Sequence, residues 1–200
     1  MRLRAMAVEF PEVVGHPNRR AFEGVLTLVD VASDKAPTGA RGHRVVLTRS
    51  AAEAALPSLL GMAVDFKAGW DGHDARQKCG VITSAEVSGQ ELRVRGYLYA
   101  KDFPEMAKEM EAHGDEVLGM SYEIADAHVD DMRAVVWRLN RVTFTGAAIL
   151  LRAKAAYRET SFRMLASGVS CAGLRGRRKP MSMPVVAKVM ERRRTNVGVR

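Results

Sequence analysis

The sequence predicts an α+β fold built around a mainly antiparallel sheet that is closed on itself or sandwiched. Most apolar segments alternate with polar residues at a period of two, as antiparallel strands with one buried face do. Only two helices are predicted between the strands, which disfavours a doubly wound parallel sheet, and one more short candidate helix lies in the tail over residues 185–194. The composition, 47% hydrophobic and 27% charged, is that of an ordinary globular protein.

The N-terminal half opens with two strands and a helix. Residues 22–31 (FEGVLTLVDV) are rich in apolar and β-branched side chains, and residues 43–48 (HRVVLT) repeat that pattern after a loop containing Pro and Gly. Ser50 is followed three residues later by Glu53, which is the pattern of a capping box. We therefore predict a short helix over residues 51–60.

The middle of the chain predicts a loop and a hairpin. Residues 61–78 begin as a short strand and become rich in Gly and Asp. Residues 79–87 and 91–99 flank a Ser-Gly-Gln turn, so they are expected to pair. Within 91–99 apolar residues and Gly96 occupy every second position, which predicts one buried face.

The third part predicts a helix and two strands. Asp102 has the position of an N-cap, Pro104 that of the first turn, and Gly114 that of a C-terminal stop. Two apolar strands then follow over residues 117–125 and 135–149, separated by an acidic turn.

The net charge of +8 lies in the C-terminal segment. Residues 173–200 hold nine Lys and Arg residues against the single Glu191, a balance equal to the charge of the whole chain. The preceding body is therefore neutral. We expect one domain over residues 1–160 and a basic, largely disordered tail over 161–200. Such a tail would bind nucleic acid only without sequence preference.

Motifs for cofactors and metals are absent from the sequence. It has no GxGxxG, GxxxxGK[ST], CxxC or HExxH pattern, and we expect no cofactor. Asp71, His73 and Asp74 could bind a cation only with a further ligand such as His113 or His128, so a solvated acidic turn is the preferred interpretation. No run of about 18 uncharged apolar residues occurs, which predicts no transmembrane helix. The two cysteines, Cys79 and Cys171, make no disulfide framework.

Ser121 is the most informative candidate nucleophile. A period of two places it with Gly119 and Glu123 on one face of its strand, opposite the apolar face. His73 is the natural base to pair with it, because imidazole titrates in the useful range. We expect the two side chains within hydrogen-bonding reach. The alternative is a mid-strand serine bonded to a neighbour and a solvent-exposed histidine.

Three sequence blocks resemble those of the tailed-phage prohead (capsid maturation) protease family. The segment from His73 to Val81 (HDARQKCGV) resembles the block HD-x4-[IC]-G-x-[IV], and residues 119–121 (GMS) resemble G-[ILM]-S. Residues 139–149 (LNRVTFTGAAI) resemble the closing strand of the family. The resemblance runs from about Phe22 to Tyr157, which is most of the neutral body.

The resemblance implies a serine endopeptidase with a fold similar to the herpesvirus assemblin proteases, a β-barrel flanked by helices. His73 and Ser121 match the catalytic positions of the family. Where its closing block often has Glu, this chain has Arg141. Glu123 and His128 are the candidates for a third member. The alternative is a catalytically inactive assembly or scaffold module of the same fold.

The family also implies substrates and a location. Its enzymes cut the scaffold and the major capsid protein, and commonly themselves, inside the procapsid in the host cytoplasm. We expect the same substrates here, no membrane partner, and leave room for a homodimer.

Overall fold

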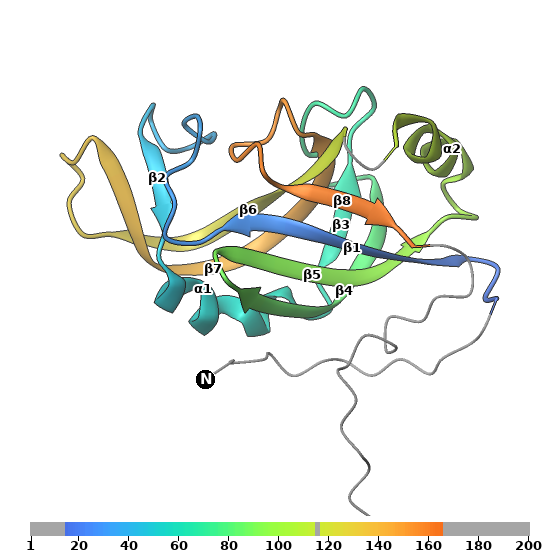
Figure 1. The fold of residues 1–200 in the computed structure, drawn as a ribbon, viewed down its shortest axis with the longest axis horizontal. Coiled ribbons are helices and arrows are strands. Elements are labelled where there is room, and N and C mark those ends of the chain that lie inside the picture. Colours follow the sequence, from blue (N-terminus) through green and yellow to red (C-terminus); the bar gives the residue numbers. More distant parts are fainter. Residues whose placement is uncertain (1–14, 115–116, 166–200) are drawn as a thin grey trace, which may run out of the picture.

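The computed structural model describes residues 15–114 and 117–165, which form one curved sheet with short helices at its margins (Figure 1). The sheet has eight strands in the order β2-β7-β3-β4-β5-β1-β8, and β6 pairs with β7 outside this path. The strands are β1 (Arg19–Leu28), β2 (Arg44–Leu47), β3 (Ala63–Phe66), β4 (Lys78–Ser88), β5 (Glu91–Tyr99), β6 (Leu118–Val129), β7 (Val136–Leu151) and β8 (Ser161–Met164).

The prediction of a strand-rich α+β fold is confirmed. The pairs β1–β5, β1–β8, β3–β4, β4–β5 and β6–β7 are antiparallel, whereas β2 and β3 both lie parallel to β7. Within the described ranges no ladder joins β8 to β6 or β2, so hydrogen bonds do not close the sheet. The long β7 has the most pairing partners in the sheet, because it pairs with β2 and β3 on one edge and with β6 on the other.

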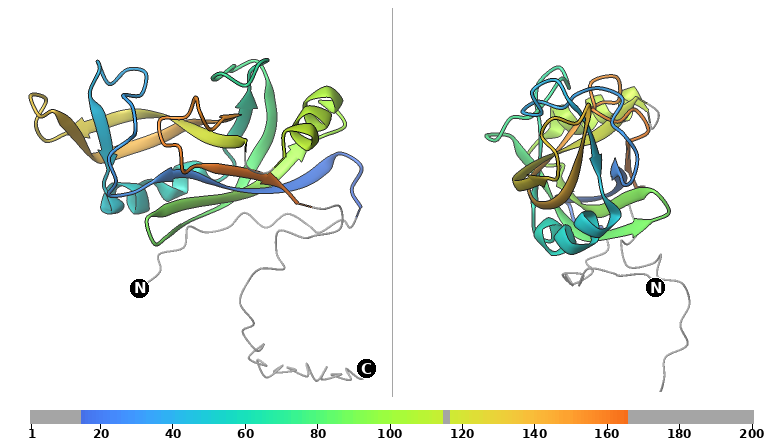
Figure 2. Two further views of the ribbon diagram at one scale, coloured as in Figure 1. Left: turned by 45° about the horizontal axis from the view of Figure 1, so that its top comes forward. Right: turned by 90° about the vertical axis from the view of Figure 1, so that its left-hand side faces the viewer.

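Both predicted helices form, but their N-caps differ from the prediction. Helix α1 (Arg49–Ala55) continues into the 3₁₀ turn η1 (Leu56–Leu59), and its cap is Thr48, whose Oγ1 accepts the Ala51 N–H at 3.3 Å. Helix α2 (Pro104–His113) begins after Phe103, because the carboxylate of Asp102 accepts the Asn18 side-chain amide instead. Helix α2 and the β6–β7 turn lie at opposite ends of the domain (Figure 2).

The strand β8 changes the predicted domain boundary. Residues 161–164 pair with β1, and Phe162 is buried against Phe22 at a ring-centroid distance of 5.4 Å. The sheet therefore extends beyond the boundary predicted at residue 160. The basic segment over residues 173–200 lies outside the described residues. No helix in the described part of the chain is long and apolar enough to cross a membrane.

The β4–β5 hairpin confirms the predicted alternation and explains one glycine. Leu92, Val94 and Leu98 are buried, and Gly96 lies on the same face. A Cβ added to Gly96 would lie 2.0 Å from the Val81 carbonyl oxygen and 2.8 Å from the Phe22 ring. The close approach of these groups therefore requires a residue without a side chain.

We expect Gly96→Ala to lower the free energy of unfolding by roughly 3 kcal/mol, because the added methyl group cannot fit without moving two strands. The measurement is urea denaturation of the full chain. Gly72→Ala is the matched control, because a Cβ added to Gly72 would meet no other atom within 4 Å. The control should stay within about 0.5 kcal/mol of the wild type. Equal denaturation midpoints for Gly96→Ala and the wild type would contradict this packing.

Candidate active site

The predicted base His73 lies in the loop between β3 and β4, which is fastened to the rest of the domain by Trp70. Trp70 is buried, and its Nε1 donates to Glu109 of α2 at 2.8 Å. Its carbonyl oxygen accepts the Leu151 N–H at 2.9 Å, and its ring meets His113 edge-on. The loop is thus held by both α2 and the end of β7, which fixes where His73 can reach.

Asp65, on β3, contacts groups from both the loop and β4 and is the central residue of this site. Its side chain is 1% exposed, and Oδ1 lies 3.5 Å from Nδ1 of His73. Oδ1 also accepts the Asp74 N–H at 3.3 Å, while Oδ2 accepts Lys78 Nζ at 2.8 Å. A buried carboxylate is costly unless it is paired, and these contacts supply its partners.

The charge state of Asp65 follows from these contacts. Burial raises the pKa of the carboxyl group, but the contacts with His73 and Lys78 outweigh it, so the pKa of Asp65 lies below its ordinary value of 3.8. Asp65 is therefore ionised at neutral pH. An ionised carboxylate beside an imidazole fixes its orientation and stabilises the imidazolium that forms when it takes a proton.

Sheet register places Ser121 on the same face as Asp65. Ser121 of β6 is opposite Ala148 of β7, and Ala148 is opposite Asp65 of β3. Residues that are directly opposite in a sheet have side chains on the same face. Ala148 is thus the small residue between Ser121 and Asp65. Ser121 is half-buried, as expected for a residue turned away from the core.

The expected hydrogen bond between Ser121 and His73 is not formed in the described residues. Nδ1 of His73 is buried without a hydrogen-bond partner, lying 3.5 Å from Asp65 and 3.7 Å from Glu123. A small movement of the ring would complete a hydrogen bond with either carboxylate. Catalytic hydrogen bonds are often long without a substrate and shorten when one binds.

Of the two predicted third members, only Glu123 reaches His73. Glu123 follows Ser121 by two residues on β6, and its side chain is 52% exposed. It packs over Gly146, where a Cβ would lie 2.5 Å from Glu123 Oε2. It therefore presents a second carboxylate to His73 from the strand that carries Ser121.

His128 is placed elsewhere. It lies in the exposed outer half of β6, where its Nδ1 is 2.7 Å from Asn140 Oδ1. The residue opposite it on β7 is Arg141. Arg141 therefore lies beside His128, several residues along the hairpin from Ser121.

Sequence reasoning missed Asp65, which was assigned only to the start of an irregular stretch. Its one signal is a carboxylate inside the short apolar run Ala63–Phe66. A charged residue inside a strand needs a partner, and the partners come from β4 and the following loop. Those contacts depend on tertiary structure, so spacing alone could not reveal them.

The other candidate residues have separate partners. Asp71 pairs with Lys67 at 3.0 Å and Asp74 with Arg76 at 3.1 Å, so each carboxylate of the acidic turn has its own cation. Within the described ranges, no group of three His, Cys, Asp or Glu side chains could hold a metal ion. Burial raises the pKa of Cys79 to about 12, which makes it an unreactive thiol at neutral pH. Cys171 lies outside the described residues.

No protein-family model matches the chain, and no curated protein is significantly similar to it in sequence. The site holds an ionised buried carboxylate beside an imidazole from the β3–β4 loop, on the sheet face that also bears the Ser121 hydroxyl.

Proposed function

We propose that the chain is a serine endopeptidase of phage procapsid maturation, which cuts the scaffold and the major capsid protein. Ser121 is the nucleophile, His73 the general base and Asp65 the acid that orients His73. The observation that carries the proposal is the contact of Asp65 with His73 on the sheet face that also bears Ser121. The resemblance of three sequence blocks to the prohead protease family supplies the substrate class.

The proposed reaction proceeds through an acyl-enzyme. His73 accepts the Ser121 proton as Oγ attacks the carbonyl carbon of the scissile bond, and ionised Asp65 stabilises the resulting imidazolium. His73 then gives this proton to the leaving amine as the C–N bond breaks. A water molecule then attacks the carbonyl carbon of the ester as His73 takes its proton, and His73 gives that proton to Oγ of Ser121 as the ester bond breaks and the acid product leaves.

We also propose that the sheet is an assemblin-like barrel whose seam between β6 and β8 is closed by packing rather than by a ladder. Two glycines support this. A Cβ on Gly119 of β6 would lie 2.6 Å from Thr160 Oγ1, directly before β8. A Cβ on Gly24 of β1 would lie 2.8 Å from the sulfur of Met120. Both glycines permit the first part of β6 to lie against β1 and β8.

The second candidate is a catalytically inactive assembly module, favoured by the absence, among the described residues, of a hydrogen bond between Ser121 and His73. A fluorophosphonate probe separates the two, because it labels only an activated serine. Covalent labelling of the purified full chain on Ser121 is expected for the enzyme, and co-expression with the neighbouring capsid protein should give a shortened capsid protein on a gel. Absence of both would support the module.

The basic segment gives a prediction about location. We expect a chain truncated near Gly173 to stay folded and to cut a short peptide normally, while its incorporation into procapsids falls. The removed segment carries the net positive charge and would attach the enzyme to acidic scaffold or shell surfaces. Incorporation is measured by quantifying both chains in purified procapsids. Equal incorporation would show that the segment is not a tether.

A further inference from the structure

Lys78 places a positive charge against Asp65, the candidate acid, and so affects the electrostatic environment of His73. It is the first residue of β4, directly after the loop that carries His73, and its Nζ donates to Oδ2 of Asp65 at 2.8 Å. The other oxygen of the same carboxylate faces Nδ1 of His73 at 3.5 Å. One buried carboxylate is therefore shared between a lysine cation and a titratable imidazole.

The charged groups around His73 come from three strands and its own loop. Asp65 faces it from β3 and Glu123 from β6, while Lys78 of β4 acts through Asp65. Within the loop, the carboxylate of Asp74 is held by Arg76, which leaves little net charge there. The remaining loop pair, Lys67 with Asp71, is likewise balanced. Without Lys78, His73 would face two carboxylates and no compensating cation.

We propose that Lys78 is a positioning residue that offsets the negative charge of Asp65 and thereby reduces how strongly this carboxylate favours the protonated form of His73. Two unbalanced carboxylates favour the imidazolium form, and an imidazolium cannot accept the Ser121 proton. Lys78 permits an orienting acid to lie against His73 without trapping the base in its protonated state. The catalytic part of this inference rests on the proposed function, whereas its electrostatic part does not.

The direct test is a titration of His73 by NMR in the full chain, with His73→Gln used to assign its signal. We expect Lys78→Met to move the titration midpoint of His73 upward by about one pH unit, the size expected for losing one charge near a partly exposed group. Lys78→Gln should do the same, and it carries the test if the Met variant does not fold. Lys78→Arg keeps the charge and should titrate like the wild type.

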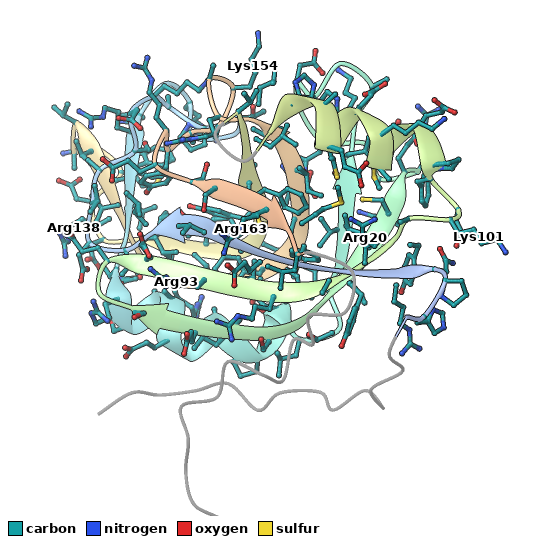
Figure 3. All side chains as sticks on the ribbon, turned by 45° about the vertical axis from the view of Figure 1, so that its right-hand side comes forward. Arg20, Arg93, Lys101, Arg138, Lys154 and Arg163 are labelled. Carbon is teal, nitrogen blue, oxygen red and sulfur yellow. The ribbon has the colours of Figure 1, made fainter. Side chains whose placement is uncertain are left out.

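Two further variants serve as controls. One tests the sign of the shift in the His73 midpoint, and the other tests whether loss of any surface lysine produces a shift. Glu123→Gln removes a negative charge next to His73, so the midpoint should move downward. Lys101→Met removes a lysine that points into solvent at the α2 end of the domain (Figure 3), and it should leave the titration unchanged.

The pH dependence of fluorophosphonate labelling gives the catalytic readout. The acid limb of the labelling rate should move upward in Lys78→Met by the same amount as the NMR midpoint. An unchanged or lowered midpoint in folded Lys78→Met and Lys78→Gln would overturn the inference. A raised midpoint in a chain that is not labelled at any pH would support the role of Lys78 and overturn the proposed enzyme.

Discussion

Ser121→Ala is expected to fold like the wild type and to leave the capsid protein and scaffold uncut. The rate of peptide-bond cleavage should fall by at least about 10³-fold, because in the proposed mechanism Ser121 is the group that forms the acyl-enzyme. Ser121 is half-buried and its side chain forms no hydrogen bond among the described residues, so the free energy of unfolding should change by less than about 1 kcal/mol.

The measurements are procapsid processing on a gel, fluorophosphonate labelling and thermal unfolding of the same preparation. Ser84→Ala is the matched control, since Ser84 is also a half-buried residue inside a strand, on β4. The control should retain processing and labelling. A Ser121→Ala chain that still trims its substrate at the wild-type rate would exclude Ser121 as the nucleophile.

Asp65→Asn is expected to reduce kcat by about 10⁴-fold, because an amide neither fixes the imidazole tautomer nor stabilises the imidazolium. Asp65→Asn should also destabilise the fold. Lys78 and the Asp74 N–H both donate to this carboxylate, so the substitution should lower the free energy of unfolding by roughly 2 kcal/mol at pH 7.

The stability difference should depend on pH with a defined sign. The pKa of Asp65 in the folded chain lies below 3.8, so the ionised carboxylate stabilises the fold above that pH, and this contribution is lost as the pH falls through the folded-state pKa. The wild type and Asp65→Asn should therefore converge in denaturation experiments as the pH is lowered below about 4.

Asp71→Asn is the control for the Asp65 experiments, because Asp71 is an exposed carboxylate of the neighbouring loop that pairs with Lys67. It should keep both activity and stability. If Asp65→Asn retained the wild-type kcat, His73 would be oriented by another group, and Glu123, 3.7 Å away, would be the residue to replace next.

Local sequence patterns predicted the elements well where they depend on local chemistry. The β4–β5 hairpin follows from strict alternation around a turn, and the end of α2 from Gly114, whose φ is 70°. The helix starts were wrong because tertiary contacts decided them: Asp102 is engaged by Asn18 across the fold. A polar side chain near a helix start can form hydrogen bonds with several alternative partners, and the sequence does not show which of these bonds forms.

The candidate site was predictable to a similar degree. His73 and Ser121 are predicted from residue type, strand face and motif order, and their catalytic roles stay predictions. Asp65 is not predicted, because its importance arises from Lys78 and His73 meeting it after the chain has turned. Conversely, the sequence suggested Arg141 as the occupant of an acid's place, yet in the fold this residue lies beside His128 on the outer hairpin.

Ala148 lies between Asp65 and Ser121, and this arrangement limits how the distance between the two residues can change. Asp65 and Ser121 are separated by the two strand spacings across Ala148, roughly 10 Å, and backbone hydrogen bonding holds that interval constant. Substitutions cannot stretch it. The loop bearing His73 is held instead by the contacts of Trp70 with Glu109 and Leu151, so changes in its length or in those contacts would move His73 while Asp65 and Ser121 keep their places. The sheet therefore fixes the distance between Asp65 and Ser121, whereas the loop determines the position of His73.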